Sequence, residues 1–289
     1  MNEILKNAAA NIPSLQWFPG HMKKAERLIV ENLKSVDIVI ELLDARIPLS
    51  SQNPLLNELL GEKPRIKVLA KSDLADERQT KKFIEKFRAC GITAIATDAG
   101  TGAGLKNLIA AAKKAAEPKT QKFHRGARAM TVGIPNVGKS SLINRLAGGN
   151  RTKTENRPGI TRANRLIKIA DGLDLFDTPG VLWAKFDDPE VAIKLAWTYA
   201  INDDVYDIEP AVYILLEVLA EKYPAPLCDR FKLSAEILEK PGHEILEKIA
   251  VNRGCIRKGG TIDVDKAAKL ILTEFRSGKL GRVTLDDPV

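Results

Sequence analysis

The sequence predicts an α/β domain built on a mostly parallel sheet with helices on both faces, followed by a smaller helical domain. Short apolar runs alternate with amphipathic segments over the first two thirds of the chain, which is typical of strands alternating with helices. A glycine-rich loop stands between one apolar run and one helical segment. After about residue 188 the strand pattern ends and helical periodicity continues. We therefore expect a first domain at residues 1–188 and a second at residues 189–289.

Five apolar runs predict buried parallel strands, at residues 36–43, 66–70, 92–96, 129–134 and 173–176. A further run at 166–169 is expected to pair with the last of these as a hairpin through Asp171-Gly172. Amphipathic segments predict helices at residues 22–34, 53–60, 77–89, 105–116 and 140–146. Residues 117–128 are polar, basic and contain a proline, so they are predicted to be a surface linker. The polar residues 150–164 are expected to form a mobile loop.

The second domain is predicted to contain helices at residues 192–200, 209–222 and 266–276. Across the 289 residues, 44% are hydrophobic and 28% charged, as in ordinary globular proteins. No apolar run approaches the roughly 18 residues of a membrane span, and the N-terminus lacks a secretory signal. Three widely spaced cysteines argue against a disulfide or a zinc site. We expect a cytoplasmic protein.

The charge balance favours an anionic partner. The chain has 45 lysines and arginines against 37 acidic residues, a formal net charge of +8. Such an excess suits RNA better than a membrane. A mildly basic enzyme with no nucleic-acid partner is the alternative that charge alone leaves open.

The strongest motif is the segment GIPNVGKS, from Gly133 to Ser140, which has the form of a phosphate-binding loop. Its glycines let backbone N–H groups face phosphates at the start of a helix, where the dipole favours anions. Lys139 is expected to reach the β- and γ-phosphates, and the Ser140 hydroxyl to bind Mg²⁺. The alternative is a chance glycine-rich turn. The nucleotide contacts expected in the loop come from Asn136, Val137, Gly138, Lys139, Ser140 and Ser141.

Two further segments complete a triphosphate-sensing site. Asp177-Thr-Pro-Gly180 follows a predicted strand, so Asp177 can hold Mg²⁺ through water while the Gly180 N–H senses the γ-phosphate. Thr161 lies on the polar loop between the two motifs. A threonine there can complete the Mg²⁺ shell only when γ-phosphate is present, which is an order–disorder switch.

Base recognition is predicted from Lys71-Ser72-Asp73, at the end of another strand. An aspartate at this place accepts two N–H bonds from guanine, which adenine cannot supply. Ala70 stands where such motifs carry asparagine, so weaker base binding is expected. An ordinary surface turn is the alternative. Thr97-Asp98-Ala99 loosely matches the short loop whose backbone N–H contacts guanine O6.

The order of these motifs is unusual. The base-recognition segments precede the phosphate loop, whereas ordinary GTPases have the reverse order, so the sequence predicts a circularly permuted P-loop GTPase domain. The linker at 117–128 then joins what are normally the two ends of the domain, which lie close together in most domains. The chain after Gly180 runs directly into the second domain, so the nucleotide state can bias the orientation of that domain.

The chain resembles the ribosome biogenesis GTPase A (YlqF type) family of circularly permuted GTPases. Besides the phosphate loop, the segments that carry the resemblance are Trp17-Phe-Pro-Gly-His21-Met22, Asp44-Ala-Arg46-Ile-Pro48, Pro158-Gly-Ile-Thr161, Asp177-Thr-Pro-Gly180, Arg253-Gly-Cys255 and Gly278-Lys-Leu-Gly281-Arg282. The resemblance implies a Mg²⁺-dependent GTPase that cycles between GTP and GDP during a late step of large ribosomal subunit assembly. It also implies that the C-terminal helical domain contacts ribosomal RNA. We expect a monomer that binds the precursor of the large subunit and neither DNA nor a membrane.

The catalytic group is the least defined part of the site. Many GTPases place a glutamine after the Asp-x-x-Gly motif to orient the attacking water, but Val181 and Leu182 follow here. The resemblance offers His21 as the water-positioning group, beside Lys139 and Thr161. Alternatively, His21 caps a helix or contacts RNA. Asn136 is a candidate K⁺ ligand, since the ion can replace a stabilising arginine in similar GTPases; the alternative is a loop asparagine bonded to its own backbone.

A basic tract near the C-terminus has two interpretations, RNA phosphate binding or a solvated helix face, because acidic residues interrupt it. Its members are Arg253, Arg257, Lys258, Lys266, Lys269, Arg276, Lys279 and Arg282. Two functional alternatives to an assembly GTPase are a GTP-dependent RNA-binding switch with little intrinsic turnover and a P-loop phosphotransferase. No acceptor-substrate site for the latter is evident in the sequence.

Overall fold

The computed structural model describes residues 19–148, 166–169, 172–183 and 186–288. These residues divide into two compact units, which we call the sheet unit (19–183 with 286–288) and the helical unit (186–285). Each unit has its own hydrophobic core and is described separately. Among the helices of the described ranges, none combines the length and the apolar character that a membrane span requires.

The sheet unit contains one six-stranded sheet in the described part of the chain, in the order β3-β2-β1-β4-β6-β5. The strands are β1 (Ile38–Asp44), β2 (Arg65–Ala70), β3 (Thr93–Ala96), β4 (Ala127–Gly133), β5 (Leu166–Ile169) and β6 (Leu173–Asp177). All neighbouring pairs are parallel except β5 and β6, which form the expected antiparallel hairpin. The predicted mostly parallel sheet is thus confirmed. Every residue of β1 is buried, which explains why its sequence is a continuous apolar run rather than an alternating one.

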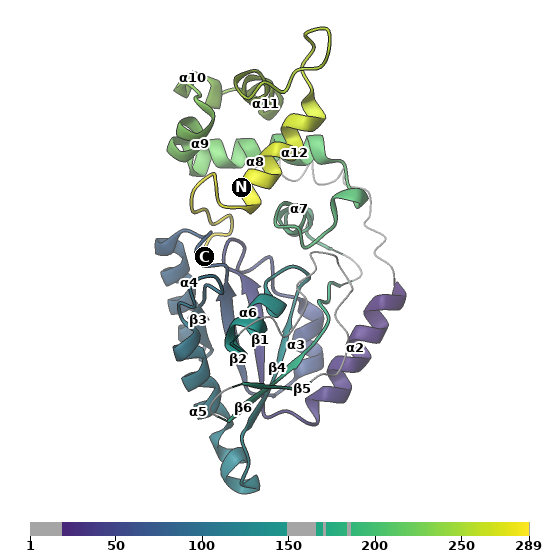
Figure 1. The fold of residues 1–289 in the computed structure, drawn as a ribbon, viewed down its shortest axis with the longest axis vertical. Helices are drawn as coiled ribbons and strands as arrows, with labels where there is room; N and C mark the ends of the chain where they lie inside the picture. The colour runs from purple at the N-terminus through teal and green to yellow at the C-terminus, as the bar shows by residue number, and fades with distance from the viewer. Residues whose placement is uncertain (1–18, 149–165, 170–171, 184–185, 289) are drawn as a thin grey trace. The chain divides into compact units, whose positions relative to one another are not determined.

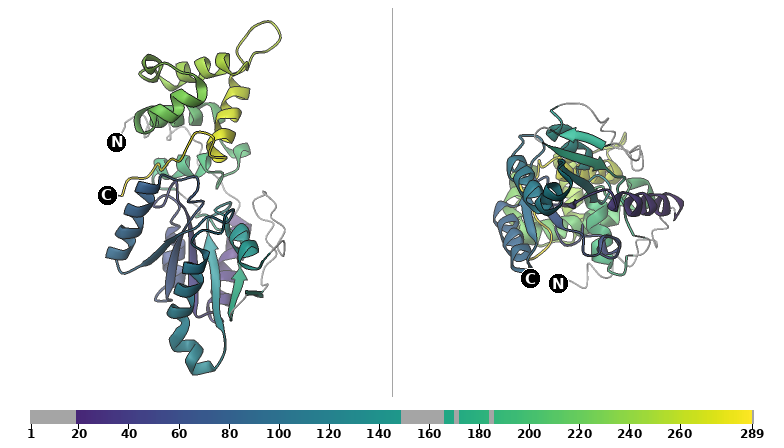
Figure 2. Two further views of the ribbon diagram at one scale, coloured as in Figure 1. Left: turned by 60° about the vertical axis from the view of Figure 1, so that its left-hand side comes forward. Right: turned by 90° about the horizontal axis from the view of Figure 1, so that it is seen from below.

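Helices cover both faces of the sheet (Figures 1 and 2). On one face, Val39 packs with α2 (Pro19–Leu33) and α3 (Pro54–Leu60). Leu43 lies four residues further along β1 and so points to the same face, where it packs with α4 (Glu77–Ala89). On the other face lie α5 (Leu105–Phe123) and α6 (Lys139–Leu146), which contact β4. Two of these helices, α3 and α4, begin at polar caps: the Asn53 side chain accepts from the Leu55 N–H, and Asp76 caps α4.

The connection between α5 and β4 differs from the prediction. The linker expected at 117–128 is wrong in its first half, because α5 continues through Pro118 to Phe123. The proline removes one N–H from the helix, and the surrounding alanine- and lysine-rich sequence tolerates this loss. The helix ends at His124, whose backbone is left-handed (φ 47°) and whose N–H bonds the Thr120 carbonyl.

The joint is held to the start of β1 by an ion pair. The Arg125 guanidinium donates to both oxygens of the Asp37 carboxylate, at 2.8 and 2.9 Å, and the Arg128 N–H donates to the same carboxylate at 2.9 Å. Burial opposes ionisation of Asp37, but these donors outweigh it and lower the pKa of the carboxyl. The chain between α5 and β4 is therefore fixed to the start of β1 at the amino end of the sheet.

The last residues of the chain belong to the sheet unit rather than to the domain at 189–289 in which the sequence placed them. The reason is Asp286, which is 3% exposed. Its carboxylate accepts hydrogen bonds from the backbone N–H groups of Leu49 and Ser50, at 2.7 and 2.8 Å, and from the Ser50 hydroxyl at 2.7 Å. This contact had no sequence signal, since it joins residues more than 200 positions apart.

The helical unit consists of α7 (Pro189–Trp197), a 3₁₀ turn (Asp203–Val205), α8 (Ile208–Lys222), α9 (Pro224–Phe231), α10 (Ala235–Leu238), α11 (Gly242–Asn252) and α12 (Val264–Arg276). The three helices predicted from periodicity correspond to α7, α8 and α12. Periodicity did not predict α9, α10 or α11. For α9 and α10, with 8 and 4 residues, few turns give little periodic signal. At Gly242 a Cβ atom would lie 2.1 Å from the Tyr213 carbonyl oxygen, so a glycine is required where α11 meets α8.

Candidate nucleotide-binding site

The predicted site residues gather at one edge of the sheet. Because β1, β2, β3, β4 and β6 are parallel, their carboxyl ends lie at the same edge, where open α/β sheets bind ligands. The phosphate loop follows β4, and Asp177 ends β6. Lys71 follows β2, and Thr97 follows β3. The Ser72 N–H donates to the Thr97 carbonyl at 3.1 Å, which joins the two predicted base-recognition loops.

Backbone geometry forms the phosphate loop. Gly133 has φ 151°, and a Cβ atom there would lie 2.6 Å from the Leu42 carbonyl oxygen of the neighbouring strand. Gly138 has φ 108° and Asn136 has φ 55°, the left-handed region that asparagine tolerates better than most residues. Val137 is buried, and α6 begins directly after Gly138 at Lys139. The loop therefore presents the N-terminus of a helix to the sheet edge, which is a favourable place for an anion.

Lys139 folds back onto the loop. Its ammonium group donates to the carbonyls of Gly133 and Ile134, at 3.1 and 2.7 Å, and the residue is 6% exposed. Burial lowers the pKa of Lys139 to about 8, Asp177 opposes that shift, and the nearby Lys71 adds to it. The carbonyl contacts hold the ammonium group against the loop.

Asp177 has the properties of a cation ligand. It is 5% exposed, and its buried Oδ1 atom accepts no hydrogen bond from the described residues. Burial raises the pKa of its carboxyl to about 6, against the attraction of Lys139. A buried carboxylate oxygen without a donor is costly unless a cation or a proton satisfies it. Carboxylate and hydroxyl oxygens are ligands that Mg²⁺ accepts, so the chemistry of Asp177 and of Ser140, at the start of α6, suits this ion.

The segment after Asp177 packs directly on the phosphate loop. A Cβ atom at Gly180 would lie 2.6 Å from the Cα of Pro135, and the Val181 N–H donates to the Gly133 carbonyl at 3.1 Å. Val181 and Leu182 are each 1% exposed, and Val181 packs in the apolar core with Val39. Neither side chain faces water, so neither can orient a water molecule for attack.

On the base side, Lys71 has a left-handed backbone (φ 56°), and its ammonium lies 3.0 Å from the Asp44 carboxylate. Asp73 is exposed, as a group that binds a ligand edge must be. Ala70 is 5% exposed, and its methyl group lies 3.9 Å from where a Cβ of Gly138 would stand. Ala70 therefore supplies no polar group where the motif usually carries an asparagine amide.

Asp98 stabilises its own loop. Its carboxylate accepts from the Gly100 N–H at 2.7 Å and from the Thr101 hydroxyl at 2.5 Å. These bonds outweigh burial and lower the pKa of Asp98. Because the side chain is occupied, contacts of this loop with a ligand would come from backbone groups, such as the N–H of Ala99.

Two predicted residues are not placed. Thr161 lies outside the described residues, as does the rest of Pro158-Gly-Ile-Thr161. His21 falls in the first turn of α2, but its side chain is outside the described part of the structure. Ser141 is exposed on α6, beside the partly exposed Ser140.

Three residues to which the motifs gave no role in the site make contacts beside it. The Asn53 side-chain amide donates to the Val181 carbonyl at 2.9 Å, and Asp44 with Arg46 lies behind Lys71. The signal for Asp44 was present as a charged residue ending an apolar strand. Asn53 had a visible role only as a helix cap.

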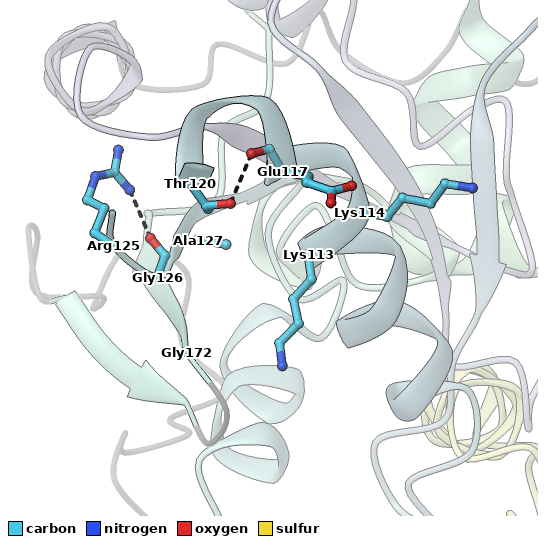
Figure 3. Close-up of a pocket in the computed structure, with 8 residues that line it drawn as sticks. All are labelled: Lys113, Lys114, Glu117, Thr120, Arg125, Gly126, Ala127 and Gly172. Carbon is cyan, nitrogen blue, oxygen red and sulfur yellow. Dashed lines mark hydrogen bonds between the residues drawn. The ribbon is translucent and has the colours of Figure 1, made fainter. Parts of the chain in front are cut away.

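Apart from this site, a cavity of about 480 Å³ lies at the α5–β4 joint, where β4 begins. Figure 3 shows its lining, with Lys113 and Lys114 extending from α5 and Arg125 donating to the Gly126 carbonyl. This cavity is at the amino end of β4, away from the phosphate loop at the carboxyl end. Its arginine is already paired with Asp37, so the cavity is not part of the predicted site.

The strand order and the site define the class of protein: a P-loop GTPase domain in which the phosphate loop follows the base-recognition strands instead of preceding them. A family model described as a 50S ribosome-binding GTPase matches residues 128–223. The chain is 46% identical over 280 residues to the ribosome biogenesis GTPase A of Bacillus cereus, covering 95% of this chain and 94% of that one. The protein belongs to the ribosome biogenesis GTPase A family, as the motif resemblance indicated.

More distant relatives agree. The ribosome biogenesis GTPase A of Thermotoga maritima is 31% identical over 274 residues, which cover 95% of each chain. Crystal structures of YlqF from T. maritima in GNP-bound and GDP-bound forms each superpose with a TM-score of 0.65, at 29% and 31% identity. They cover 92% and 90% of this chain and 98% of each of those chains. The predicted fold is therefore confirmed, and the protein is a GTPase.

Proposed function

We propose that the protein binds the precursor of the large ribosomal subunit and hydrolyses GTP to drive a late step of its assembly. The observation that carries the proposal is the packing of Gly180 on Pro135, in a chain of this family. Through this contact a change at the γ-phosphate position reaches the segment that leads into the helical unit. The ribosomal partner is inferred from the names of the relatives and from the basic charge of the chain.

Within this proposal each group has a role. Lys71, Ser72 and Asp73 hold guanine, with backbone groups of Thr97, Asp98 and Ala99 on its O6 edge. Asn136, Val137, Gly138, Lys139, Ser140 and Ser141 hold the phosphates. Ser140, Thr161 and Asp177 bind Mg²⁺, Asn136 binds K⁺, and Gly180 senses the γ-phosphate. The exposed Asp73 and the donor-free Oδ1 of Asp177 support the base and metal assignments.

The chemistry follows from charge. When nucleotide binds, the Lys139 ammonium exchanges two backbone carbonyls for phosphate oxygens, which are stronger acceptors because they are charged. Bound Mg²⁺ would supply neutralisation of the charge that develops on the phosphates. Because Val181 and Leu182 are buried, water positioning must come from another segment, and we assign it to His21 or the Thr161 loop. The ribosomal particle would accelerate hydrolysis by ordering that segment.

The RNA contact is proposed in the helical unit. A cavity of about 580 Å³ lies between α9, the end of α11 and the turn after α12, and four of its lining residues are basic: Arg230, Lys232, Arg253 and Lys279. Both arginines are paired with Glu274, whereas the ammonium groups of the exposed Lys232 and Lys279 make no hydrogen bond or ion pair within the described residues. Two unneutralised ammonium groups beside a cavity suit an RNA phosphate.

The basic tract of the sequence contains residues that are used within the helical unit and residues that line this cavity. Arg276 is used internally, because it pairs with Asp203 at 2.6 Å and donates to the carbonyls of Ala196 and Trp197. Lys269 pairs with Asp265 along α12 at 2.8 Å. Of the tract, we therefore assign RNA binding to Lys279, and we add Lys232 from the C-cap of α9. Arg230 and Arg253 line the same cavity but are paired with Glu274.

The alternative of a GTP-dependent RNA-binding switch with little intrinsic turnover is favoured by one observation, the burial of Val181 and Leu182. It differs from the main proposal only in whether the particle stimulates hydrolysis.

The test is GTP hydrolysis at moderate salt, with and without large-subunit precursor particles and with ATP as the base control. Stimulation of at least tenfold, specific to GTP, is expected. Particle binding without stimulation would favour the low-turnover switch. Neither binding nor stimulation would contradict the ribosomal assignment, and equal use of ATP would contradict the base assignment.

The RNA contact is tested with a double variant, Lys232→Gln and Lys279→Gln. We expect particle affinity to fall about tenfold and the slope of log affinity against log salt to decrease by about 2, one per lost phosphate contact. The charge-matched control, Lys266→Gln with Lys269→Gln on α12, should change neither. Equal effects of the two double variants would mean that general charge, not this cavity, binds the particle.

A further inference from the structure

A buried ion pair lies directly behind the predicted base-recognition loop. Asp44, the last residue of β1, accepts from the Nε and Nη2 atoms of Arg46 at 2.9 and 2.8 Å, and from the Arg46 backbone N–H at 3.1 Å. The side chains of Asp44 and Arg46 are 2% and 1% exposed. A buried pair of this kind is a poor source of stability, because removing both charges from water costs about as much as their attraction returns. Its presence at the sheet edge therefore calls for another reason.

The pair extends to a third charge, Lys71. The Lys71 ammonium donates to Asp44 Oδ2 at 3.0 Å. Its backbone is left-handed, a conformation that a residue with a Cβ adopts only when its surroundings enforce it. The strands supply part of that enforcement, since Asp44 stands opposite Ala70 in the parallel register and the Ala45 N–H donates to the Ala70 carbonyl at 2.9 Å. Lys71 is thus held both at its backbone and at the end of its side chain.

We propose that Asp44, oriented by Arg46, is a positioning residue that holds Lys71 in place for guanine-nucleotide binding and so compensates for the alanine at residue 70. The inference rests on the proposed role of Lys71 in base recognition. The Ala70 side chain is a methyl group and can donate no hydrogen bond to hold the loop. The anchoring of the loop then comes from the neighbouring strand β1, through a carboxylate.

Electrostatics explain why the anchor must be an anion. Lys71 lies near two other cations, Arg46 and Lys139, each of which disfavours its charge. Burial also lowers the pKa of Lys71, and Asp44 is the principal group that opposes this. Burial disfavours the Asp44 charge in turn, but Arg46 and Lys71 together hold its pKa well below the usual range. Without Asp44, repulsion among three cations would move the Lys71 side chain toward solvent.

A double-mutant cycle on the full-length protein tests the proposal. GDP affinity is measured by calorimetry for the wild type, Asp44→Asn, Lys71→Met and the double variant. We expect Lys71→Met to weaken GDP binding by about tenfold, the value of one charge-assisted contact, and Asp44→Asn to weaken it by about three- to tenfold. If Asp44 acts through Lys71, the double variant binds no more weakly than Lys71→Met alone.

A matched control separates positioning from folding. Asp37 is another buried carboxylate held by an arginine fork, at the opposite end of β1. Asp37→Asn should lower the melting temperature, as Asp44→Asn also should, and leave GDP affinity unchanged. If Asp44→Asn does not fold, the pair Asp44→Asn with Arg46→Met removes both buried charges and enters the same cycle with Lys71→Met.

Two results would overturn the inference, and they differ in what else they affect. Additive losses from Asp44→Asn and Lys71→Met would show that Asp44 does not act through Lys71, while the base assignment would stand. Wild-type affinity of Lys71→Met would remove the base assignment itself, and the positioning role with it.

Discussion

The phosphate half and the base half of the site are built by different means. At the phosphate loop, the requirements are steric: Gly133, Gly138 and Gly180 each lack a Cβ where backbone must approach backbone or turn left-handed. At the base loop, the chain relies on buried charge, with Asp44, Arg46 and Lys71 linked through short hydrogen bonds. The phosphate half therefore depends on glycines that lack a Cβ atom, and the base half depends on buried charged side chains.

This difference predicts how each half responds to change. An added Cβ atom at Gly133 or Gly180 would lie 2.6 Å from neighbouring backbone atoms, so substitutions there should cause large losses of activity. A charge network allows partial compensation, so substitutions there should have graded effects.

The largest effect is expected from Lys139→Met. The variant keeps the length of the side chain and removes the buried charge that the loop carbonyls hold in place. Loss of one preorganised charge at the transition state should lower the rate of GTP hydrolysis by about 100- to 1,000-fold. Single-turnover hydrolysis measures this effect. A loss below tenfold would contradict the assignment of Lys139 to the phosphates.

Gly180→Ala should uncouple γ-phosphate sensing from nucleotide binding. The new methyl group would meet the Pro135 backbone, so the segment must move by about an ångström from the phosphate loop. Misplacement on this scale lowers turnover by about 100-fold. GDP affinity should change by less than about threefold, because GDP has no γ-phosphate. Equal losses for GDP and for a GTP analogue would contradict the sensing role.

The Asp177 carboxyl predicts a dependence on pH. Its pKa is raised from 3.8 to about 6, so between these values the folded protein binds a proton that the unfolded chain does not. The contribution of Asp177 to the stability of the nucleotide-free protein therefore decreases as pH rises from about 4 to 6. Since Mg²⁺ requires the ionised carboxylate, apparent Mg²⁺ affinity should fall by up to about tenfold per pH unit below pH 6.

Calorimetric titration of Mg²⁺ into the nucleotide-bound protein at pH 5, 6 and 7 measures the dependence. The control is Asp177→Asn, which should bind Mg²⁺ weakly and without the pH dependence. A wild-type affinity that does not change between pH 5 and 6 would exclude Asp177 as the titrating ligand.

The smallest effect is expected from Ala70→Asn, which restores the usual residue of the motif. If Asp44 already anchors Lys71, the new amide adds at most one net hydrogen bond, and GDP affinity should rise by less than about threefold. Calorimetry decides this. A gain above tenfold would mean that the base half is poorly anchored in the natural protein, against the inference drawn for Asp44.

The same contrast explains what the sequence predicted. The sheet, its hairpin and most of its helices follow from apolar periodicity. The phosphate half follows from a short contiguous motif, whose glycines stand where a Cβ atom would clash or where the backbone is left-handed. The buried network of the base half joins residues on two strands, and the Asp286 contact joins residues far apart in the chain. Asp44 was visible as a charged residue ending an apolar run, but neither pairing has a local signal. Pro118 misled the prediction because a single proline does not always end a helix.

The proposed assembly function is tested most directly by asking whether the bound nucleotide controls binding to the large-subunit precursor. Co-sedimentation of the protein with purified precursor particles would be measured in the presence of a non-hydrolysable GTP analogue, of GDP, and of the corresponding adenine nucleotides. If GTP controls the assembly step, particle binding should be at least tenfold stronger with the GTP analogue than with GDP. The adenine nucleotides should show no such difference. Equal binding with the GTP analogue and GDP would contradict a GTP-controlled assembly step.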